Sequence, residues 1–491
     1  MLFNSYPFMI FFPIILLIYF LVPKKIRYIV LLVGSYYFYM CWNVKYVILI
    51  LFSTVITYLA GLCIEKTQYK KSAMTASIVL NLAVLAFFKY FDFAIDSINS
   101  LLKGAGVSII NNPFDIILPV GISFYTFQAL GYTIDVYRGN MKAEKNFLRY
   151  ALFVSFFPQL VAGPIERSGS LLTQLNNADK INVWNFKRIC SGAYMMLWGY
   201  FLKMMIADRL SILVDNIFDD YLAQGTIILL MGAVAFSLQI YCDFASYSAI
   251  AIGAAKIMGF TLMENFDTPY FAMSIKEFWR RWHISLSTWF RDYLYIPLGG
   301  NRKGKVRKYI NLMITFLASG LWHGANWTFV FWGGLHGLYQ IIGDLCLPIR
   351  EKICKIFSVK TDTFSHKAMR IFATFMLTLF AWIFFRAESI GQGFTYVGRI
   401  FTKWDPWVIF DSSVFAFGLE QVEMFILFVS LLVVFVISVI QYEKKIRFDE
   451  MLLKQNGWFQ FLIFYCLVMV IIVFGKYGSF EDANAFLYFQ F

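Results

Sequence analysis

Long apolar runs recur from one end of the chain to the other, and polar residues gather in the short stretches between them. A helix needs about 20 apolar residues to cross the hydrocarbon core of a membrane. Runs near that length predict membrane spans at residues 5–22, 27–42, 44–63, 73–92, 116–135, 147–163, 186–206, 226–257, 309–345, 368–386, 421–440 and 458–475. Because the two longest windows have room for a break, a re-entrant segment or two helices, the prediction is about 11 to 13 spans.

This pattern predicts an all-α fold, a single polytopic membrane bundle over residues 1–491 without internal repeats or a soluble domain. Residues 263–308 are amphipathic instead of continuously apolar. They are expected to lie at the membrane surface or to dip into it as short helices and loops buried in protein. Residues 476–491 form an aromatic C-terminal tail. The first run has neither a basic segment before it nor a small-residue cleavage site after it, which predicts a retained span.

The composition agrees with a membrane protein. Of the 491 residues, 59% are hydrophobic, 20% are aromatic and 15% are charged, whereas about 25% are charged in soluble domains. The net charge of +13 suggests nucleic acid as a partner. The lysines and arginines, however, lie in short loops between apolar runs, where they set the topology of a membrane protein. Nucleic-acid binding is therefore excluded.

Basic clusters on alternate loops mark those loops as cytoplasmic by the positive-inside rule. The clusters are Lys24, Lys25 and Arg27; Lys66, Lys70 and Lys71; Arg138, Lys142, Lys145 and Arg149; Arg302, Lys303, Lys305, Arg307 and Lys308; and Lys444, Lys445 and Arg447. Their order predicts that the N-terminus and the C-terminal tail both lie outside.

Several kinds of chemistry find no support in the sequence. The seven cysteines are scattered without paired spacing, so neither a disulfide framework nor a zinc site is predicted. No carboxylate-rich set suggests another metal, and neither a Gly-x-Ser-x-Gly elbow nor a Walker Gly-Lys-Ser occurs. The basic loop at residues 299–308 would attract either the phosphates of a nucleotide-like carrier or anionic lipid headgroups.

The stretch SGLWHGANW, residues 319–327, places a histidine inside an apolar run. A polar group at membrane depth is costly and often marks a functional cavity, which makes His323 the strongest catalytic candidate. The alternative is a core histidine bonded to a backbone carbonyl. Gly320 and Gly324 would clear space on one side of a helix, either for a substrate or for a closely packed second helix.

The other three histidines receive different interpretations. His336 lies 13 positions after His323, about 20 Å away along one straight helix, so the two share a site only if the helix breaks, for example at residues 333–334. A structural role is favoured for it. His283 lies among arginines and tryptophans. It belongs either to an interfacial helix whose arginines snorkel or to a second polar wall over the His323 pocket. His366 is expected in a loop.

Six segments resemble the membrane-bound O-acyltransferases, and within them the bacterial membrane subunits for O-acetylation of alginate and of peptidoglycan. They are LPVGISFYTFQALGYTIDVYRG (118–139), FFPQLVAGPIER (156–167), DFASYSAIAIGAAKIMGF (243–260), EFWRRWHISLSTWFRDYLYIPLGGNR (277–302), GLWHGANWTFVFWGGLHG (320–337) and FLYFQF (486–491). A sister group, which transfers D-alanine to teichoic acid, shares the same skeleton. The IPLGGNR that follows the histidine motif favours the acetyl branch.

The resemblance implies a helical fold around a membrane-buried tunnel in the bacterial cytoplasmic membrane, with an acyl thioester on the cytoplasmic side and an acceptor arriving from outside. It implies His323 as the catalytic histidine and His283 as the second histidine of the motif. The implied donor is acetyl-CoA, with an acyl-carrier phosphopantetheine thioester as the alternative. The implied partner is an extracellular SGNH-type acetyltransferase or esterase, which would select the polysaccharide.

On this interpretation, His323 takes the proton of an acceptor hydroxyl while that oxygen attacks the thioester carbonyl. His283 or Asn326 would orient the acceptor or stabilise the oxyanion. The side chains expected to line the tunnel are Trp279, Arg280, Trp282, Trp322, Asn326 and Trp327.

The tail carries Tyr488 three residues before the C-terminal Phe491. It resembles the aromatic tyrosine motif of a small partner peptide in teichoic acid D-alanylation, which implies that Tyr488 relays the acyl group. A phenyl ester transfers its acyl group readily because phenol, with a pKa of about 10, is a good leaving group. The alternative is an interfacial aromatic anchor.

Two other classes of function are alternatives to an enzyme. A transporter or flippase built from inverted repeats would show matched broken helices in two halves of the chain, and the sequence shows no such pair. A non-catalytic scaffold for an envelope-modifying complex would not need His323.

Overall fold

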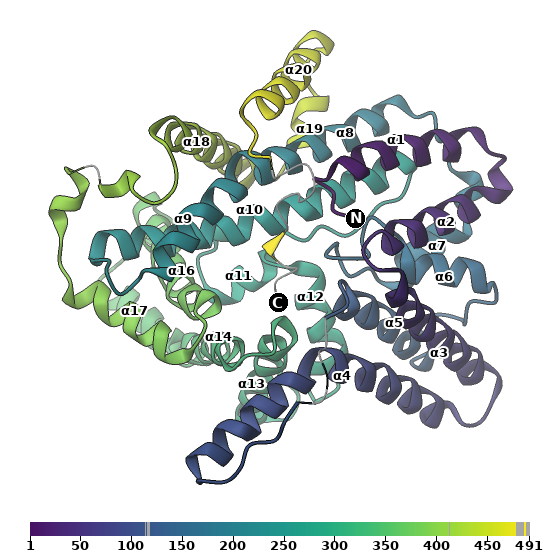
Figure 1. The fold of residues 1–491 in the computed structure, drawn as a ribbon, viewed down its shortest axis with the longest axis horizontal. Coiled ribbons are helices and arrows are strands. Elements are labelled where there is room, and N and C mark those ends of the chain that lie inside the picture. Colours follow the sequence, from purple (N-terminus) through teal and green to yellow (C-terminus); the bar gives the residue numbers. More distant parts are fainter. Residues whose placement is uncertain (113, 115–117, 412, 478–485, 488–491) are drawn as a thin grey trace.

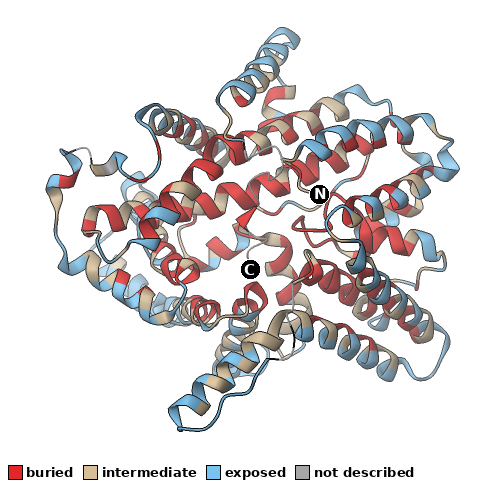
Figure 2. Ribbon diagram, in the orientation of Figure 1, coloured by how far each residue is buried: buried red, intermediate tan, exposed pale blue. Residues whose placement is uncertain are grey.

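The computed structural model describes residues 1–112, 114, 118–411, 413–477 and 486–487. Every regular element among them is helical, and the α-helices are labelled α1 to α20 in chain order (Figure 1). They form one broad bundle in which buried residues gather toward the middle and exposed residues toward the rim (Figure 2). The predicted all-α, polytopic membrane fold is confirmed.

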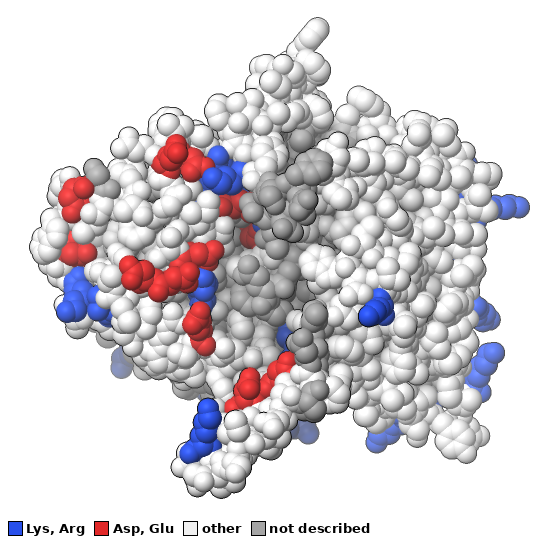
Figure 3. Space-filling model, in the orientation of Figure 1, with Lys and Arg blue, Asp and Glu red and all other residues white. Residues whose placement is uncertain are grey.

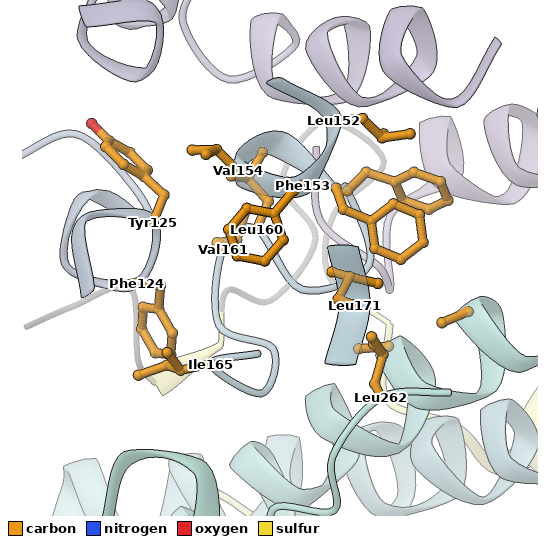
Figure 4. Close-up of a cluster of buried hydrophobic side chains, with 14 of the residues drawn as sticks. Phe124, Tyr125, Leu152, Phe153, Val154, Leu160, Val161, Ile165, Leu171 and Leu262 are labelled. Carbon is orange, nitrogen blue, oxygen red and sulfur yellow. The ribbon is translucent and has the colours of Figure 1, made fainter. Parts of the chain in front are cut away.

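The first part of the chain folds as seven helices around an apolar core. They are α1 (Tyr6–Leu21), α2 (Arg27–Met40), α3 (Val47–Lys66), α4 (Lys70–Gly104), α5 (Ile122–Tyr137), α6 (Phe147–Ser155) and α7 (Ser168–Asn176). Nearly all of α5 is buried, including polar residues such as Gln128, so neighbouring elements surround this helix. In this core Phe124 of α5 lies beside Ile165, and Val154 of α6 lies beside Leu160 (Figure 4).

The remaining helices complete the bundle, and most of them surround a second core. They are α8 (Phe186–Phe201), α9 (Asp208–Asp219), α10 (Thr226–Met258), α11 (Ile275–Arg281), α12 (Ile284–Phe290), α13 (Gly304–His323), α14 (Trp327–Leu345), α15 (Leu347–Ile356), α16 (Phe364–Arg386), α17 (Ile390–Thr402), α18 (Gln421–Lys444), α19 (Phe448–Leu453) and α20 (Gly457–Phe474). A π-helical turn, Leu202–Ala207, joins α8 to α9.

The helix α10 runs through the middle of the bundle and contributes to both cores. It crosses α8 at glycines. A Cβ added at Gly192 would lie 2.6 Å from the carbonyl oxygen of Gly253, and one added at Gly253 would lie 2.5 Å from that of Gly192. Small residues let two backbones approach this closely, so these glycines fix the central helix against its neighbour.

Seven helices among the described residues are long and apolar enough to cross a membrane. They are Val44–Lys66, Lys70–Gly104, Phe186–Asp219, Thr226–Met258, Phe364–Arg386, Gln421–Lys444 and Gly457–Phe474, and α1 is a shorter apolar helix. This number is below the predicted 11 to 13, because the windows at 27–42, 116–135 and 147–163 fold as the shorter helices α2, α5 and α6. The window at 226–257 is one helix, whereas the window at 309–345 breaks into α13 and α14.

The outermost helices present apolar side chains away from the protein. On α18 and α20 these include Phe425, Phe428 and Trp458, which are 67%, 66% and 86% exposed. The face drawn in Figure 3 carries few charges over the N-terminal helices apart from lysines and arginines at its rim. Such a surface suits contact with lipid, which offers no penalty for exposed apolar groups.

The amphipathic segment at residues 263–308 forms short elements instead of one span. The helices α11 and α12 are followed by a π-helical turn, Arg291–Tyr295. Phe278, Trp282 and Leu286 of this segment are buried against other helices. The segment therefore brings the residues between α11 and α12 into the interior of the bundle.

Candidate active site

The helical hairpin of α13 and α14 carries His323 at its turn. The helix α13 ends at His323, because Gly324 is extended (φ −161°, ψ 153°). Asn326 then caps α14, its side-chain oxygen accepting the backbone N–H of Thr328 at 3.0 Å. The imidazole of His323 is only 4% exposed. The break thus places a buried histidine at the end of one helix, close to the start of the next.

The glycines around His323 serve helix packing. A Cβ added at Gly320 would lie 2.2 Å from the carbonyl oxygen of Phe329, and one added at Gly333 would lie 2.3 Å from that of Phe316. Beside Gly324, the ring of Phe329 occupies the corresponding space. Of the two interpretations of these glycines, the structure supports the packed second helix, since α14 fills the space that a substrate would need.

One hydrogen bond fixes the tautomer of His323. Its Nδ1 lies 2.7 Å from the carbonyl oxygen of Ser319. A carbonyl only accepts, so Nδ1 carries the hydrogen and the lone pair of the neutral ring is on Nε2. The hydrogen bond to a backbone carbonyl that a structural histidine would make is therefore present. It engages Nδ1, and the basic lone pair is on Nε2.

His283 is held in the same way, between α11 and α12. Its Nδ1 lies 3.1 Å from Oδ1 of Asn265, and the same oxygen accepts the backbone N–H and the hydroxyl of Ser285 at 3.2 and 2.9 Å. Because that oxygen is already an acceptor for a backbone N–H, Nδ1 of His283 donates to it and Nε2 holds the lone pair. The backbone of His283 has φ +42°, a conformation that residues other than glycine rarely adopt.

The two histidines face one another inside an aromatic shell. Their ring centroids are 6.4 Å apart with the planes at 87°. Trp322 contacts both rings, at 6.0 Å from His283 and 5.1 Å from His323. Phe244 of α10 lies 4.6 Å from His283, and Trp332 of α14 lies 5.0 Å from His323. Two histidines 40 positions apart in sequence thus share one buried place.

The other predicted lining residues lie at different distances from this pair. Trp279 donates its indole N–H to Nδ1 of His336 at 3.2 Å. Trp282 packs on Phe266 and Trp382. Arg280 is exposed. Trp322, by contrast, contacts both imidazoles with its ring.

Asn326 and Trp327 form hydrogen bonds with neighbouring segments. Besides capping α14, Asn326 donates to the carbonyl of Glu388 at 3.1 Å. Trp327 is 55% exposed and donates its indole N–H to Ser97 of α4 at 3.2 Å. Both residues therefore fasten the hairpin to its neighbours.

His336 lies closer to His323 than a straight helix would allow. The break occurs at residues 324–326 instead of at 333–334, and the hairpin brings the ring of Trp332 within 5.0 Å of His323 and 4.9 Å of His336. His336 accepts from Trp279, which fits the structural role favoured for it. His366 lies in the first turn of α16, so its expected place in a loop is wrong.

A buried ionic group that sequence analysis did not single out binds the end of the described chain. Lys203 pairs with Asp208 at 2.9 Å and with Asp243 at 2.7 Å. Asp243 also accepts the backbone N–H of Leu487 at 2.6 Å, and the ring of Phe486 lies 4.3 Å from the lysine ammonium. The sequence did contain a signal for this group, because Lys203 and Asp243 are charged residues inside apolar windows. Tyr488 lies outside the described residues.

A pocket borders the histidine pair on the side of α4 and α5. It is lined by Lys89, Pro119, Gly121, Phe124 and Trp322, among others. Phe124 stacks at 6.4 Å from His283, and it lies 5.3 Å from Trp322. The pocket is therefore separated from both imidazoles by aromatic rings that contact them.

Comparison with known proteins places the chain in a family. The profile of the membrane-bound O-acyltransferases matches residues 142–385, which include both histidines. The chain is 40% identical over 413 residues to the probable alginate O-acetylase of Pseudomonas syringae pv. tomato, covering 82% of this chain and 76% of that protein. The chain belongs to the membrane-bound O-acyltransferase family. The predicted resemblance is confirmed.

Further relatives of this O-acyltransferase include both branches considered from the sequence. It is 37% identical over 391 residues to the peptidoglycan O-acetyltransferase of Helicobacter pylori, covering 73% of this chain and 71% of that protein. It is 30% identical over 292 residues to the teichoic acid D-alanyltransferase of Streptococcus thermophilus, covering 54% of this chain and 68% of that protein. The protein is thus a multi-pass membrane O-acyltransferase, homologous to O-acetyltransferases, and its reaction requires an acyl donor.

Proposed function

We propose that the protein takes an acetyl group from a cytoplasmic thioester and passes it across the membrane for O-acetylation of an extracellular polysaccharide, with His323 as the general base. The observation that carries the proposal is the tautomer of His323. The Ser319 carbonyl holds the hydrogen on Nδ1 at 2.7 Å, so Nε2 has the lone pair that a base needs. The 40% identity to an alginate O-acetylase favours acetyl as the group transferred.

In the proposed step, His323 takes one proton and later returns it. Nε2 of His323 takes the proton of the acceptor hydroxyl while the hydroxyl oxygen bonds to the thioester carbonyl carbon. The tetrahedral intermediate then loses its carbon–sulfur bond, and the thiolate takes the proton back from the imidazolium. An ester and a free thiol leave, and His323 is neutral again. Aromatic side chains around the pair keep water from the thioester.

His283 has a role that follows from its own hydrogen bond. With Nδ1 donating to Asn265, the neutral ring has only an acceptor, Nε2, to offer a substrate. Such a nitrogen accepts a hydrogen bond from a second donor group of the bound acceptor, since the reacting hydroxyl gives its one hydrogen to His323, and it does not donate to an oxyanion. Asn326, the other residue considered, is engaged as a helix cap. We therefore assign His283 to orientation of the acceptor.

The proposal includes Tyr488 as the first acceptor. The phenol oxygen would receive the acetyl group and give it to an extracellular SGNH-type acetyltransferase or esterase. The residues just before it support this: Leu487 is bound to Asp243, and Phe486 contacts Tyr247 at 5.1 Å. Tyr247 lies one turn after Phe244, the residue of α10 that contacts His283. The chain thus approaches the histidine pair along one face of α10.

Thioester consumption tests the base. The purified protein in lipid vesicles is given acetyl-CoA, an acetylated phosphopantetheine carrier or a D-alanylated carrier, and the released thiol is measured. His323→Ala is expected to lower the rate by about 10²–10⁴-fold, the usual contribution of a general base. His366→Ala is the matched control. Full activity in His323→Ala would refute the base, preference for the D-alanylated carrier would favour the sister activity, and an inactive wild type would favour a scaffold or transporter.

Mass spectrometry tests the relay. After incubation with the donor alone, the C-terminal peptide of the wild type is expected to carry an acetyl group on Tyr488. Tyr488→Phe should lose that group and the transfer to an acceptor, while its insertion into the membrane persists. Tyr477→Phe, a change to a half-exposed tyrosine of the same tail, should keep both. Normal transfer by Tyr488→Phe would leave the tail as an anchor.

A further inference from the structure

A lysine of α4 reaches the end of the helix that carries His323. The helix α4 is a candidate membrane span with a mostly exposed apolar surface, so an ammonium within it is costly unless it is bound. Nζ of Lys89 donates to the carbonyl oxygens of Trp322 at 2.6 Å and of His323 at 3.1 Å. The helices α4 and α13 meet in the lower part of Figure 1, and these hydrogen bonds join them.

These carbonyls need donors because α13 stops at His323. The last four carbonyls of a helix have no N–H from a following turn, and the extended Gly324 carries the chain away. Tyr90, the next residue of α4, donates its hydroxyl to the carbonyl of Leu321 at 2.9 Å. A cation is also the favourable charge at this end of a helix dipole. The helix α4 therefore binds three successive carbonyls at the break.

Lys89 acts on the peptide of the candidate base itself. One of its bonds is to the carbonyl of His323, and the other is to that of Trp322, the side chain that contacts both imidazoles. Its ammonium also lies 5.8 Å from the centre of the Trp322 ring, within range of a cation–π attraction. The side chain of Lys89, from another helix, thus fixes both the backbone of His323 and its aromatic neighbour Trp322.

We infer that Lys89 is a positioning residue for His323, holding the broken end of α13 so that the imidazole keeps its place against donor and acceptor. This inference rests on the proposed function of His323. A displacement of about 1 Å in a reacting group lowers a rate about 10²-fold. An ammonium bound to two carbonyls at the break opposes such a displacement, because α13 has no helical N–H of its own to offer those carbonyls.

Kinetics of Lys89 variants test the inference. The protein in lipid vesicles is assayed with acetyl-CoA and with the acetylated carrier, and kcat, KM and the unfolding temperature are measured. Lys89→Met is expected to lower kcat by about 10-fold to 100-fold with little change in KM, since the base is misplaced while the donor still binds. Lys89→Arg should recover most of the rate, because a guanidinium also donates to two carbonyls. Lys103→Met, at the exposed end of the same helix, should behave as wild type.

Four outcomes overturn the inference. A Lys89→Met protein with a lower unfolding temperature but an unchanged kcat would make Lys89 only a helix cap. Equal loss of kcat in Lys89→Arg and Lys89→Met would show that donation to the carbonyls is not what matters. If His323→Ala is inactive while Lys89→Met is normal, this inference alone fails. If His323→Ala is fully active, the proposed function fails and the inference fails with it.

Discussion

His323 and His336 lie on the two helices of one hairpin and are both buried, yet their hydrogen bonds select opposite tautomers. Nδ1 of His323 faces a carbonyl oxygen, which accepts, so it carries the hydrogen. Nδ1 of His336 receives the indole N–H of Trp279, so it carries the lone pair. Burial therefore does not distinguish a base from a structural histidine. The partner of each ring nitrogen does.

The surroundings of the two rings differ in the same sense. His323 has a second imidazole, His283, at 6.4 Å, and that imidazole also has its hydrogen fixed on Nδ1. His336 lies among aromatic rings, with Trp279 at 5.1 Å and Trp332 at 4.9 Å. One place thus combines two lone pairs of the same kind, which suits the handling of a hydroxyl proton. The other uses its lone pair to satisfy a tryptophan.

The largest expected effect among tests of this comparison comes from His283. His283→Asn is the informative variant, because asparagine tolerates positive φ better than most residues and the backbone here has φ +42°. Loss of the orienting nitrogen is expected to lower kcat for thiol release about 100-fold, with the KM for the donor retained. Thiol release over a range of donor concentrations measures both constants. An unchanged kcat would leave His323 without its neighbour's help and would contradict the paired role.

A smaller effect is expected from the hairpin that carries both histidines. Gly320→Ala places a Cβ 2.2 Å from the backbone oxygen of Phe329, whereas Gly334→Ala meets only the side chain of Leu317 at 3.5 Å. The first change forces α13 and α14 apart and should destabilise the fold by about 1–3 kcal/mol, as overpacking does. The second is the matched control. Thermal unfolding in detergent compares them, and equal unfolding temperatures would mean that the hairpin is not closely packed.

The sequence predicted the fold class and indicated different roles for His323 and His336. It did not predict the hydrogen bonds that distinguish these two histidines. The apolar window at 309–345 was recognised as long enough to break, although the glycines favoured for the break, at 333–334, instead lie in a helix against α13. Periodicity describes one helix at a time and does not say which helix packs on it. The carbonyl of Ser319 and the indole of Trp279 therefore could not be assigned to their histidines before the fold was known.

A second cause explains why the sequence did not indicate several residues near the site. Asn265, Lys203 and Asp243 are single polar residues, and each gains its importance from a partner elsewhere in the chain, namely His283, Asp243 and Leu487 respectively. A polar residue at membrane depth indicates that some partner exists. It does not identify the partner, so the tail's attachment to α10 required the structure.

The smallest expected effect on turnover concerns the structural histidine. His336→Phe keeps a ring in place but leaves the indole N–H of Trp279 without its acceptor, which should cost about 1–3 kcal/mol of stability. The double change His336→Phe with Trp279→Phe removes both partners, and replacing both is nearly neutral except for the smaller ring. The double variant should therefore be more stable than the sum of the two single changes predicts, and the rate per folded molecule should stay close to wild type. Unfolding temperature and thioester turnover measure the two parts. A loss of turnover in His336→Phe comparable to that in His323→Ala would mean that the opposite tautomers do not separate a base from a structural residue.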